Sequence, residues 1–271
     1  MTKKQIILVV LVILLPYALA AQTYEQMVES ALKAAQADSL EEAESLYKQA
    51  IRMAPDDYRN ALAYHDLGHV QEMLYWKNPS ESKKYEEALF NYSKAVEMQP
   101  TAIPIVFSRA NFYLNLKNYG KAIYDYSSIL EMVPTNIDAL NYRAFAYFQQ
   151  REYERARADY ESVLRLKASD PNAALGVALV LQKTNKFGEA IKRMDFLVAE
   201  YPERDDLLSV RASMLADREQ YELALIDMDR AIELSPANPA YYLQRAEIYE
   251  KKGNKKLATR DRRMAAKLPL F

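Results

Sequence analysis

The sequence predicts an all-α fold, in which about seven helix hairpins stack into a solenoid. Three observations lead to this prediction. Alanine, aromatic and proline residues recur along the chain at one common spacing. Glycine is scarce, with 5 among 271 residues, whereas hydrophobic residues make up 50%. The remaining composition is rich in Ala, Leu, Glu, Lys and Tyr, which is typical of a helical chain.

The repeat is clearest in two columns of alanine, one for each helix of a hairpin. The first column is Ala88, Ala122, Ala156, Ala190, Ala224 and Ala258. The second column is Ala110, Ala144, Ala178, Ala212 and Ala246. The same frame holds the aromatic residues Tyr119, Tyr153, Phe187 and Tyr221, and the prolines Pro100, Pro134, Pro202 and Pro236. Four columns that share one period indicate a structural repeat.

The spacing within one period fits two helices that pack against each other. Small residues let the two backbones approach closely, and large apolar residues three and four positions away fill the space around them. The residues expected to face each other in 103–134 are Val106, Ala110 and Tyr113 from the first helix and Ala122, Tyr126 and Ile129 from the second. A single hairpin cannot bury its apolar face alone, so neighbouring hairpins must stack.

These motifs resemble the tetratricopeptide repeat (TPR) family. Leu67-Gly68 is similar to the family's early Leu-Gly pair, Ala122-x3-Tyr126 to its A-x3-F motif, and Pro134 to its closing proline. The resemblance covers nearly the whole chain after residue 21. It implies a right-handed α-solenoid that binds a protein or peptide and is not an enzyme. The repeats are placed at about 24–57, 58–102, 103–136, 137–170, 171–204, 205–238 and 239–271.

The second repeat is longer than the others by about eight residues. The step from Gly68 to Ala88 is twenty residues, whereas the step from Ala110 to Ala122 is twelve. The extra residues are expected in a loop near 76–83, because the Asn-Pro-Ser sequence there is typical of a turn.

Residues 1–21 are expected to be a signal peptide of the bacterial Sec type. Two lysines precede an aliphatic run over 6–15, and Ala18 and Ala20 fit a cleavage site before Ala21 or Gln22. A periplasmic or secreted location follows, with no stable membrane insertion after cleavage. The alternative is an uncleaved anchor, although the run is shorter than the roughly 20 residues that span a bilayer.

Composition excludes several kinds of site. The net charge of −1 gives no basic stripe for nucleic acid. The chain has no cysteine, so thiolate metal sites and cysteine nucleophiles are excluded. Five glycines leave little from which to build a phosphate-binding loop. We therefore expect no cofactor and no catalysis.

The TPR resemblance implies that the first helix of each repeat lines a concave groove where a partner binds. The candidate groove residues are His65, His69, Glu72, Phe107, Asn111, Asn115, Asn141, Phe145, Phe148, Gln149 and Gln182. Amide side chains could bond to the backbone of an extended peptide, and the phenylalanines could form apolar pockets. In the alternative interpretation, Phe145 and Phe148 are core residues. The recurring Arg109, Arg143, Arg211 and Arg245 are expected to form salt bridges between repeats.

Two other functions stay open at this stage. His65 and His69 are four residues apart, as in the His-Glu-x-x-His zinc motif, and are weak candidates for a metal site. No further His or Cys completes such a site, so a metal is not expected. The second alternative is a self-assembling structural scaffold, in which one copy binds another as a homo-oligomer.

Overall fold

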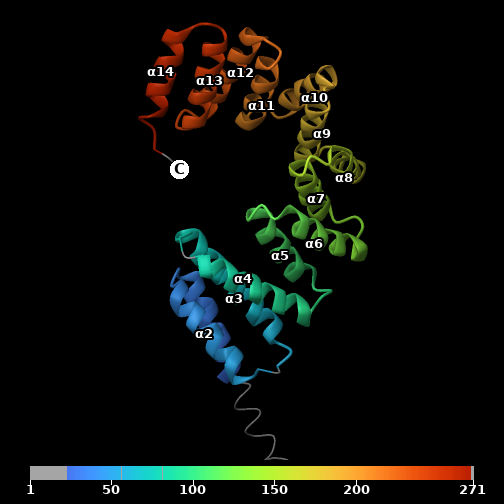
Figure 1. The fold of residues 1–271 in the computed structure, drawn as a ribbon, viewed down its shortest axis with the longest axis vertical. Coiled ribbons are helices and arrows are strands. Elements are labelled where there is room, and N and C mark those ends of the chain that lie inside the picture. The colour runs from blue at the N-terminus through green and yellow to red at the C-terminus, as the bar shows by residue number, and fades with distance from the viewer. Residues whose placement is uncertain (1–22, 56, 81, 270–271) are drawn as a thin grey trace, which may run out of the picture. The chain divides into compact units, whose positions relative to one another are not determined.

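The computed structural model describes residues 23–55, 57–80 and 82–269. All regular secondary structure in these ranges is helical (Figure 1), and the predicted all-α solenoid is confirmed. The predicted signal peptide, residues 1–21, lies outside the described residues.

The helices alternate between the first and second members of successive hairpins. A first helix over residues 23–36 pairs with α2 (Leu40–Met53). The later first helices are α3 (Asn60–Lys77), α5 (Ile103–Asn115), α7 (Ile137–Gln149), α9 (Pro171–Lys183), α11 (Asp205–Ala216) and α13 (Pro239–Lys251). The later second helices are α4 (Ser82–Met98), α6 (Tyr119–Met132), α8 (Tyr153–Leu166), α10 (Phe187–Glu200), α12 (Tyr221–Leu234) and α14 (Lys255–Ala265).

The chain divides into two compact units, Met1–Ala139 and Leu140–Phe271. In the first unit, Leu40 and Tyr47 of α2 pack with Leu67 of α3. In the second unit, Leu208 of α11 packs with Met228 of α12. The six residues predicted to face each other in α5 and α6 are all buried, as the repeat pattern requires.

The turn between the two helices of a hairpin repeats one backbone conformation. The residues with positive φ in these turns are Asp38, Lys117, Arg151, Asn185, Glu219 and Gly253, and the last five follow the same period as the alanine columns. In the turn at Lys117, the backbone N–H of Asn118 donates to the carbonyl of Tyr113 at 2.8 Å, which closes the helix end. Five described non-glycine residues therefore hold a left-handed conformation that costs each about 1 kcal/mol or more.

The extra residues of the second hairpin form helix rather than a long loop, so that prediction was wrong. α3 has 18 residues and α4 has 17, whereas α5 has 13 and α6 has 14. Trp76 and Lys77 belong to α3, and the described non-helical residues between α3 and α4 are 78–80. The turn predicted at Asn78-Pro79 is present, but the residues on either side of it belong to the helices α3 and α4.

The recurring arginines pair mainly within their own hairpins. Each binds an aspartate sixteen residues later in two-pronged geometry: Arg109 with Asp125, Arg143 with Asp159, Arg211 with Asp227 and Arg245 with Asp261. Two of them also reach the preceding hairpin: Arg211 binds Asp195 at 3.0 Å and Arg245 binds Asp229 at 2.6 Å. The prediction of salt bridges between repeats is thus confirmed for two arginines, while the most buried partner lies on the next helix of the same hairpin.

One close helix approach depends on glycine. A Cβ atom added at Gly176 of α9 would lie 2.4 Å from the Tyr160 ring of α8. Tyr160 is buried, and burial raises the pKa of its hydroxyl. A larger residue at 176 would have to displace this ring.

Candidate partner-binding faces

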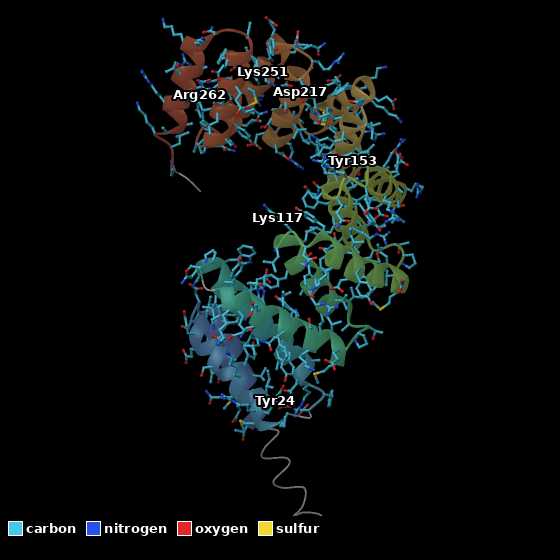
Figure 2. The ribbon with its side chains drawn as sticks, viewed as in Figure 1. Tyr24, Lys117, Tyr153, Asp217, Lys251 and Arg262 are labelled. Atoms are coloured by element: carbon cyan, nitrogen blue, oxygen red, sulfur yellow. The ribbon has the colours of Figure 1, made fainter. Side chains whose placement is uncertain are left out.

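The first helices of neighbouring hairpins lie side by side within each unit. His65 of α3 lies 2.9 Å from the Ser108 hydroxyl of α5, measured from Nε2 to Oγ. In the second unit, the Gln182 amide of α9 donates to Asp217, just after α11, at 3.2 Å. Lys251 of α13 lies 3.7 Å from the same aspartate (Figure 2). We call the outward side chains of these first helices the first-helix face.

His65 is held by groups of the chain itself. Its Nδ1 lies 2.8 Å from an oxygen of Asp66, and its Nε2 contacts Ser108. The ring also meets Tyr92 edge to face at 5.9 Å. Because both ring nitrogens have partners, His65 is positioned to connect α3 with α5.

His69 and Glu72 form a second polar group on α3. Glu72 accepts hydrogen bonds from Tyr92 at 2.7 Å and from Trp76 at 3.3 Å. Burial alone would raise the pKa of Glu72, but the nearby His69 and the hydrogen bonds from Tyr92 and Trp76 outweigh burial and lower this pKa. The Glu72 carboxylate, 3.9 Å from the ring, raises the pKa of His69. The His69 side chain is 63% exposed, so its imidazole can contact a partner.

The candidates on α5 are partly used inside the chain. Asn111 accepts a hydrogen bond from the Tyr126 hydroxyl at 2.6 Å, and the half-buried Phe107 meets the same tyrosine edge to face at 5.6 Å. Asn115 is exposed. Asn115 is therefore better placed than Asn111 to hydrogen-bond the backbone of a bound peptide.

In the second unit, the two phenylalanines separate into two roles. Phe145 is 41% exposed, whereas Phe148 is half-buried and packs edge to face against Tyr153 at 5.6 Å. Gln149 is exposed, and Asn141 carries a buried Oδ1 for which the described residues supply no hydrogen-bond donor. Phe145 and Gln149 are the candidates of α7 most open to a partner.

A pocket on the other side of α3 was not predicted from the sequence. The pocket encloses about 520 Å³ between α2, α3 and α4, and Leu67 and Gln71 line it from α3. These two residues lie two positions from His65 and His69, so they point about 200° away from the first-helix face. One sequence signal could have indicated this site: Leu67 and Asn91 stand where the next hairpin has Arg109 and Asp125.

Within the described ranges, no cluster of three or more His, Cys, Asp or Glu side chains could hold a metal ion. Over the same part of the chain, none of the helices combines the length and the apolar character that crossing a membrane requires.

Comparison with known proteins places this geometry among helical repeats. A family model described as ChAPs (Chs5p-Arf1p-binding proteins) matches residues 68–260. No curated protein matches the chain in sequence.

Three solved structures are similar in fold. A tetratricopeptide repeat protein from Parabacteroides merdae has a TM-score of 0.80 at 25% identity, over 92% of this chain and 94% of that one. PilF from Pseudomonas aeruginosa has a TM-score of 0.60 at 17% identity, over 86% and 99%. MamA from Desulfovibrio magneticus has a TM-score of 0.52 at 18% identity, over 61% and 94%.

Proposed function

Because the chain belongs to the ChAPs (Chs5p-Arf1p-binding proteins) family of TPR-like helical repeats, we propose that it is a scaffold that holds a peptide or protein partner on its first-helix face. Helical repeat proteins of this kind act through protein interaction, and the family description itself names proteins as what its members bind. The fold alone does not determine which partner is bound, so the proposal is argued from the exposed side chains of the helices.

The observation that carries the proposal is an exposed stripe along α3. Leu62, His69 and Trp76 are seven residues apart and therefore lie near one line on the helix surface. Leu62 is 57% exposed and Trp76, the single tryptophan of the chain, is 45% exposed. An exposed tryptophan is typical of a protein interface, where aromatic residues contribute most of the binding energy.

The same side of α7 supports the proposal in the second unit. Tyr142 and Phe145 are 42% and 41% exposed and lie three residues apart, so they share one surface of the helix. Gln149, four residues further, is exposed on that surface. Apolar rings next to an amide suit a polypeptide, whose backbone needs hydrogen bonds and whose side chains need apolar contact.

We further propose that the scaffold is exported, on the basis of the predicted signal peptide at residues 1–21. Mass spectrometry of the chain from fractionated cells should give a new N-terminus at Ala21 or Gln22 in the periplasmic or secreted fraction. A full-length chain in the membrane fraction would instead support the anchor.

The geometry gives no support to the metal-binding alternative. Both ring nitrogens of His65 already have partners, and His69 faces Glu72 at 3.9 Å. The crosslinking experiment described next also tests self-assembly, the other alternative.

The test is site-specific photo-crosslinking in the native cell. A photoreactive phenylalanine analogue replaces Leu62 or Phe145 on the first helices, or Tyr124 or Ile226 on the second helices as matched controls. Tyr124 and Ile226 are 70% and 63% exposed, so all four positions tolerate the probe. Adducts to one other polypeptide from Leu62 or Phe145, and from neither control, would support the proposal. Adducts only to a second copy would support self-assembly, and adducts only from the controls would reject the first-helix face.

A further inference from the structure

We propose that the pocket between α2, α3 and α4 is a second binding site, which takes up a bulky apolar side chain of an acidic polypeptide segment. The inference rests on the proposed function, because it takes the partner to be a polypeptide. It concerns the side of α3 opposite the first-helix face, and all of its residues belong to the first unit.

The walls of the pocket are apolar and come from three helices. Ile51 of α2, Tyr64 and Leu67 of α3, and Phe90 of α4 line a volume of about 520 Å³. Phe90 is 58% exposed, so an apolar group in the pocket would cover part of its ring. A volume of this size accommodates several apolar groups, and open pockets lined by aromatic and aliphatic residues are typical binding sites.

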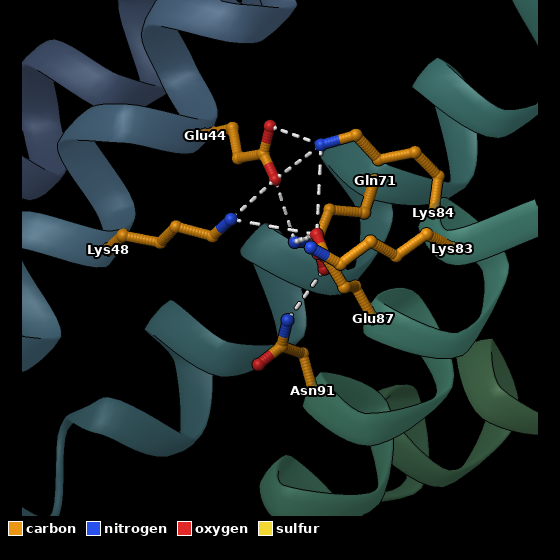
Figure 3. Close-up of polar contacts among 7 residues, drawn as sticks. All are labelled: Glu44, Lys48, Gln71, Lys83, Lys84, Glu87 and Asn91. Carbon is orange, nitrogen blue, oxygen red and sulfur yellow. Dashed lines mark hydrogen bonds and ion pairs between the residues drawn. The ribbon is translucent and has the colours of Figure 1, made fainter. Parts of the chain in front are cut away.

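A buried polar network holds the three helices around the pocket (Figure 3). The fully buried amide of Gln71 donates to Glu44 of α2 at 2.9 Å and to Glu87 of α4 at 3.0 Å. Its oxygen accepts from Asn91 at 2.6 Å, and Lys84 donates to both oxygens of Glu44 at 2.8 and 2.7 Å. Because every member is bonded, the network keeps α2 and α4 at a fixed separation and the pocket is preorganised for a ligand.

The network also explains why the pocket occurs in this hairpin. In the next hairpin, the Arg109–Asp125 pair connects a first helix to the second helix beside it. Here Leu67 replaces the arginine, so an apolar side chain lines the pocket where a guanidinium would stand. Asn91 replaces the aspartate and bonds to Gln71 instead.

The charges at the rim favour an acidic segment. The pocket lining carries three cations, Lys48, Arg52 and Lys83, and two carboxylates, Glu86 and Glu87. Burial would raise the pKa of Glu44, but hydrogen bonds from Gln71 and two lysines outweigh burial and leave this pKa at about 2. Glu44 therefore stays ionised and paired.

Arg52 and Lys83 are the rim cations most available to a partner. Arg52 donates from Nε to the carbonyl of Lys48 and forms no ion pair with any described residue. Lys83 is 85% exposed and lies 3.4 Å from Glu87. In a chain of net charge −1, these cations line an apolar pocket from two different helices, α2 and α4. A partner with one large apolar side chain flanked by Asp or Glu matches both features.

The experiment is a selection of random twelve-residue peptides on the full chain. The pocket variant is Phe90→Ser, and its matched control is Tyr124→Ser, the same repeat position on α6 and 70% exposed. The charge variant is Arg52→Glu with Lys83→Glu. A first-helix variant, Leu62→Ser with Phe145→Ser, is selected in parallel, and thermal melting verifies that every variant is folded.

The expected result is enrichment of peptides with Leu, Phe or Trp next to Asp or Glu. Phe90→Ser should weaken their binding about tenfold through lost apolar contact, while Tyr124→Ser should leave it unchanged. The charge variant should weaken acidic peptides by roughly three- to tenfold and should favour peptides with Lys or Arg flanks.

The outcomes separate this inference from the proposed function. Peptides that survive Phe90→Ser but are lost in the first-helix variant would overturn the pocket and support the first-helix face. Peptides that survive both variants, or that ignore the charge reversal, would also overturn the pocket, as would the absence of any enriched peptide.

Discussion

The pairing of Arg109 with Asp125 can be tested by removing first one partner and then both. Asp125 is 1% exposed and the Arg109 side chain is 15% exposed. Two charge-assisted bonds join them, from Nε at 2.8 Å and from Nη2 at 2.7 Å. The variants are Asp125→Leu, Arg109→Met and the double substitution, in which both charges are replaced by apolar side chains of similar length.

The magnitude follows from the burial of both groups. Removing either partner leaves a buried charge without compensation, which costs about 3–5 kcal/mol of unfolding free energy. The partial exposure of Arg109 favours the lower end for Asp125→Leu, about 3 kcal/mol. Removing both leaves no buried charge, and Leu67 in the preceding hairpin demonstrates that an apolar side chain fits at the arginine position. The double variant should therefore lose about 1 kcal/mol, far less than the sum of the single losses.

The assay is equilibrium urea unfolding, followed by circular dichroism and by the fluorescence of Trp76, which lies in the same unit as the pair. Coincident curves from the two probes would permit a two-state treatment. The control is the pair of Arg157 and Glu161 on α8, with side chains 34% and 41% exposed, whose coupling should not exceed about 0.5 kcal/mol.

Two results would refute this reasoning. If each single variant of the buried pair lost less than about 1 kcal/mol, the charges would not be desolvated as the structure has them. If the double variant lost as much unfolding free energy as the two single variants together, the coupling energy would be zero and the two residues would act independently.

Other predictions concern titration and backbone geometry. The pKa of Glu44 is lower in the folded chain than in the unfolded chain, so the ionised carboxylate stabilises the fold above pH 4.5. About 3 kcal/mol of unfolding free energy should be lost as the pH falls from 4.5 to about 2. The Glu44→Gln variant should lose less stability over the same acid titration. Gly176→Ala should lower the melting temperature, because the new Cβ meets the buried ring of Tyr160. The expected loss of unfolding free energy is about 1–3 kcal/mol. An unchanged melting temperature would mean that the ring moves freely. Glu219→Gly should raise the unfolding free energy by about 1 kcal/mol, because glycine adopts a positive φ without strain and the change removes a negative charge from a helix C-terminus. A lower unfolding free energy, measured with urea, would contradict this. Titration by nuclear magnetic resonance should give His69 a pKa above 6.5, and Glu72→Gln should lower it.

The repeat period, read from the sequence, determined the helix hairpins and their packing faces. Ala110, Ala122 and Tyr126 could be assigned to the core because close helix approach requires small residues at fixed positions and large ones beside them. The first-helix candidates came from the TPR resemblance, which the same register carried from one hairpin to the next, since residues one period apart occupy equivalent places. The groove itself, and the residues predicted to bind a partner there, still await the crosslinking experiment.

Tertiary structure alone decided how individual side chains are used. Asn111 was expected to offer its amide to a peptide, but it accepts a hydrogen bond from Tyr126, a residue of the next helix. The exchange of the Arg–Asp pair for Leu67 and Asn91 was the one sequence signal of the pocket, but it did not specify the pocket, because the walls come from three helices and the network joins residues up to 40 positions apart. Periodicity specifies which face of a helix is buried, because that depends on spacing along one helix. It does not specify which polar atoms meet, because that depends on distances between helices, which only the folded chain fixes.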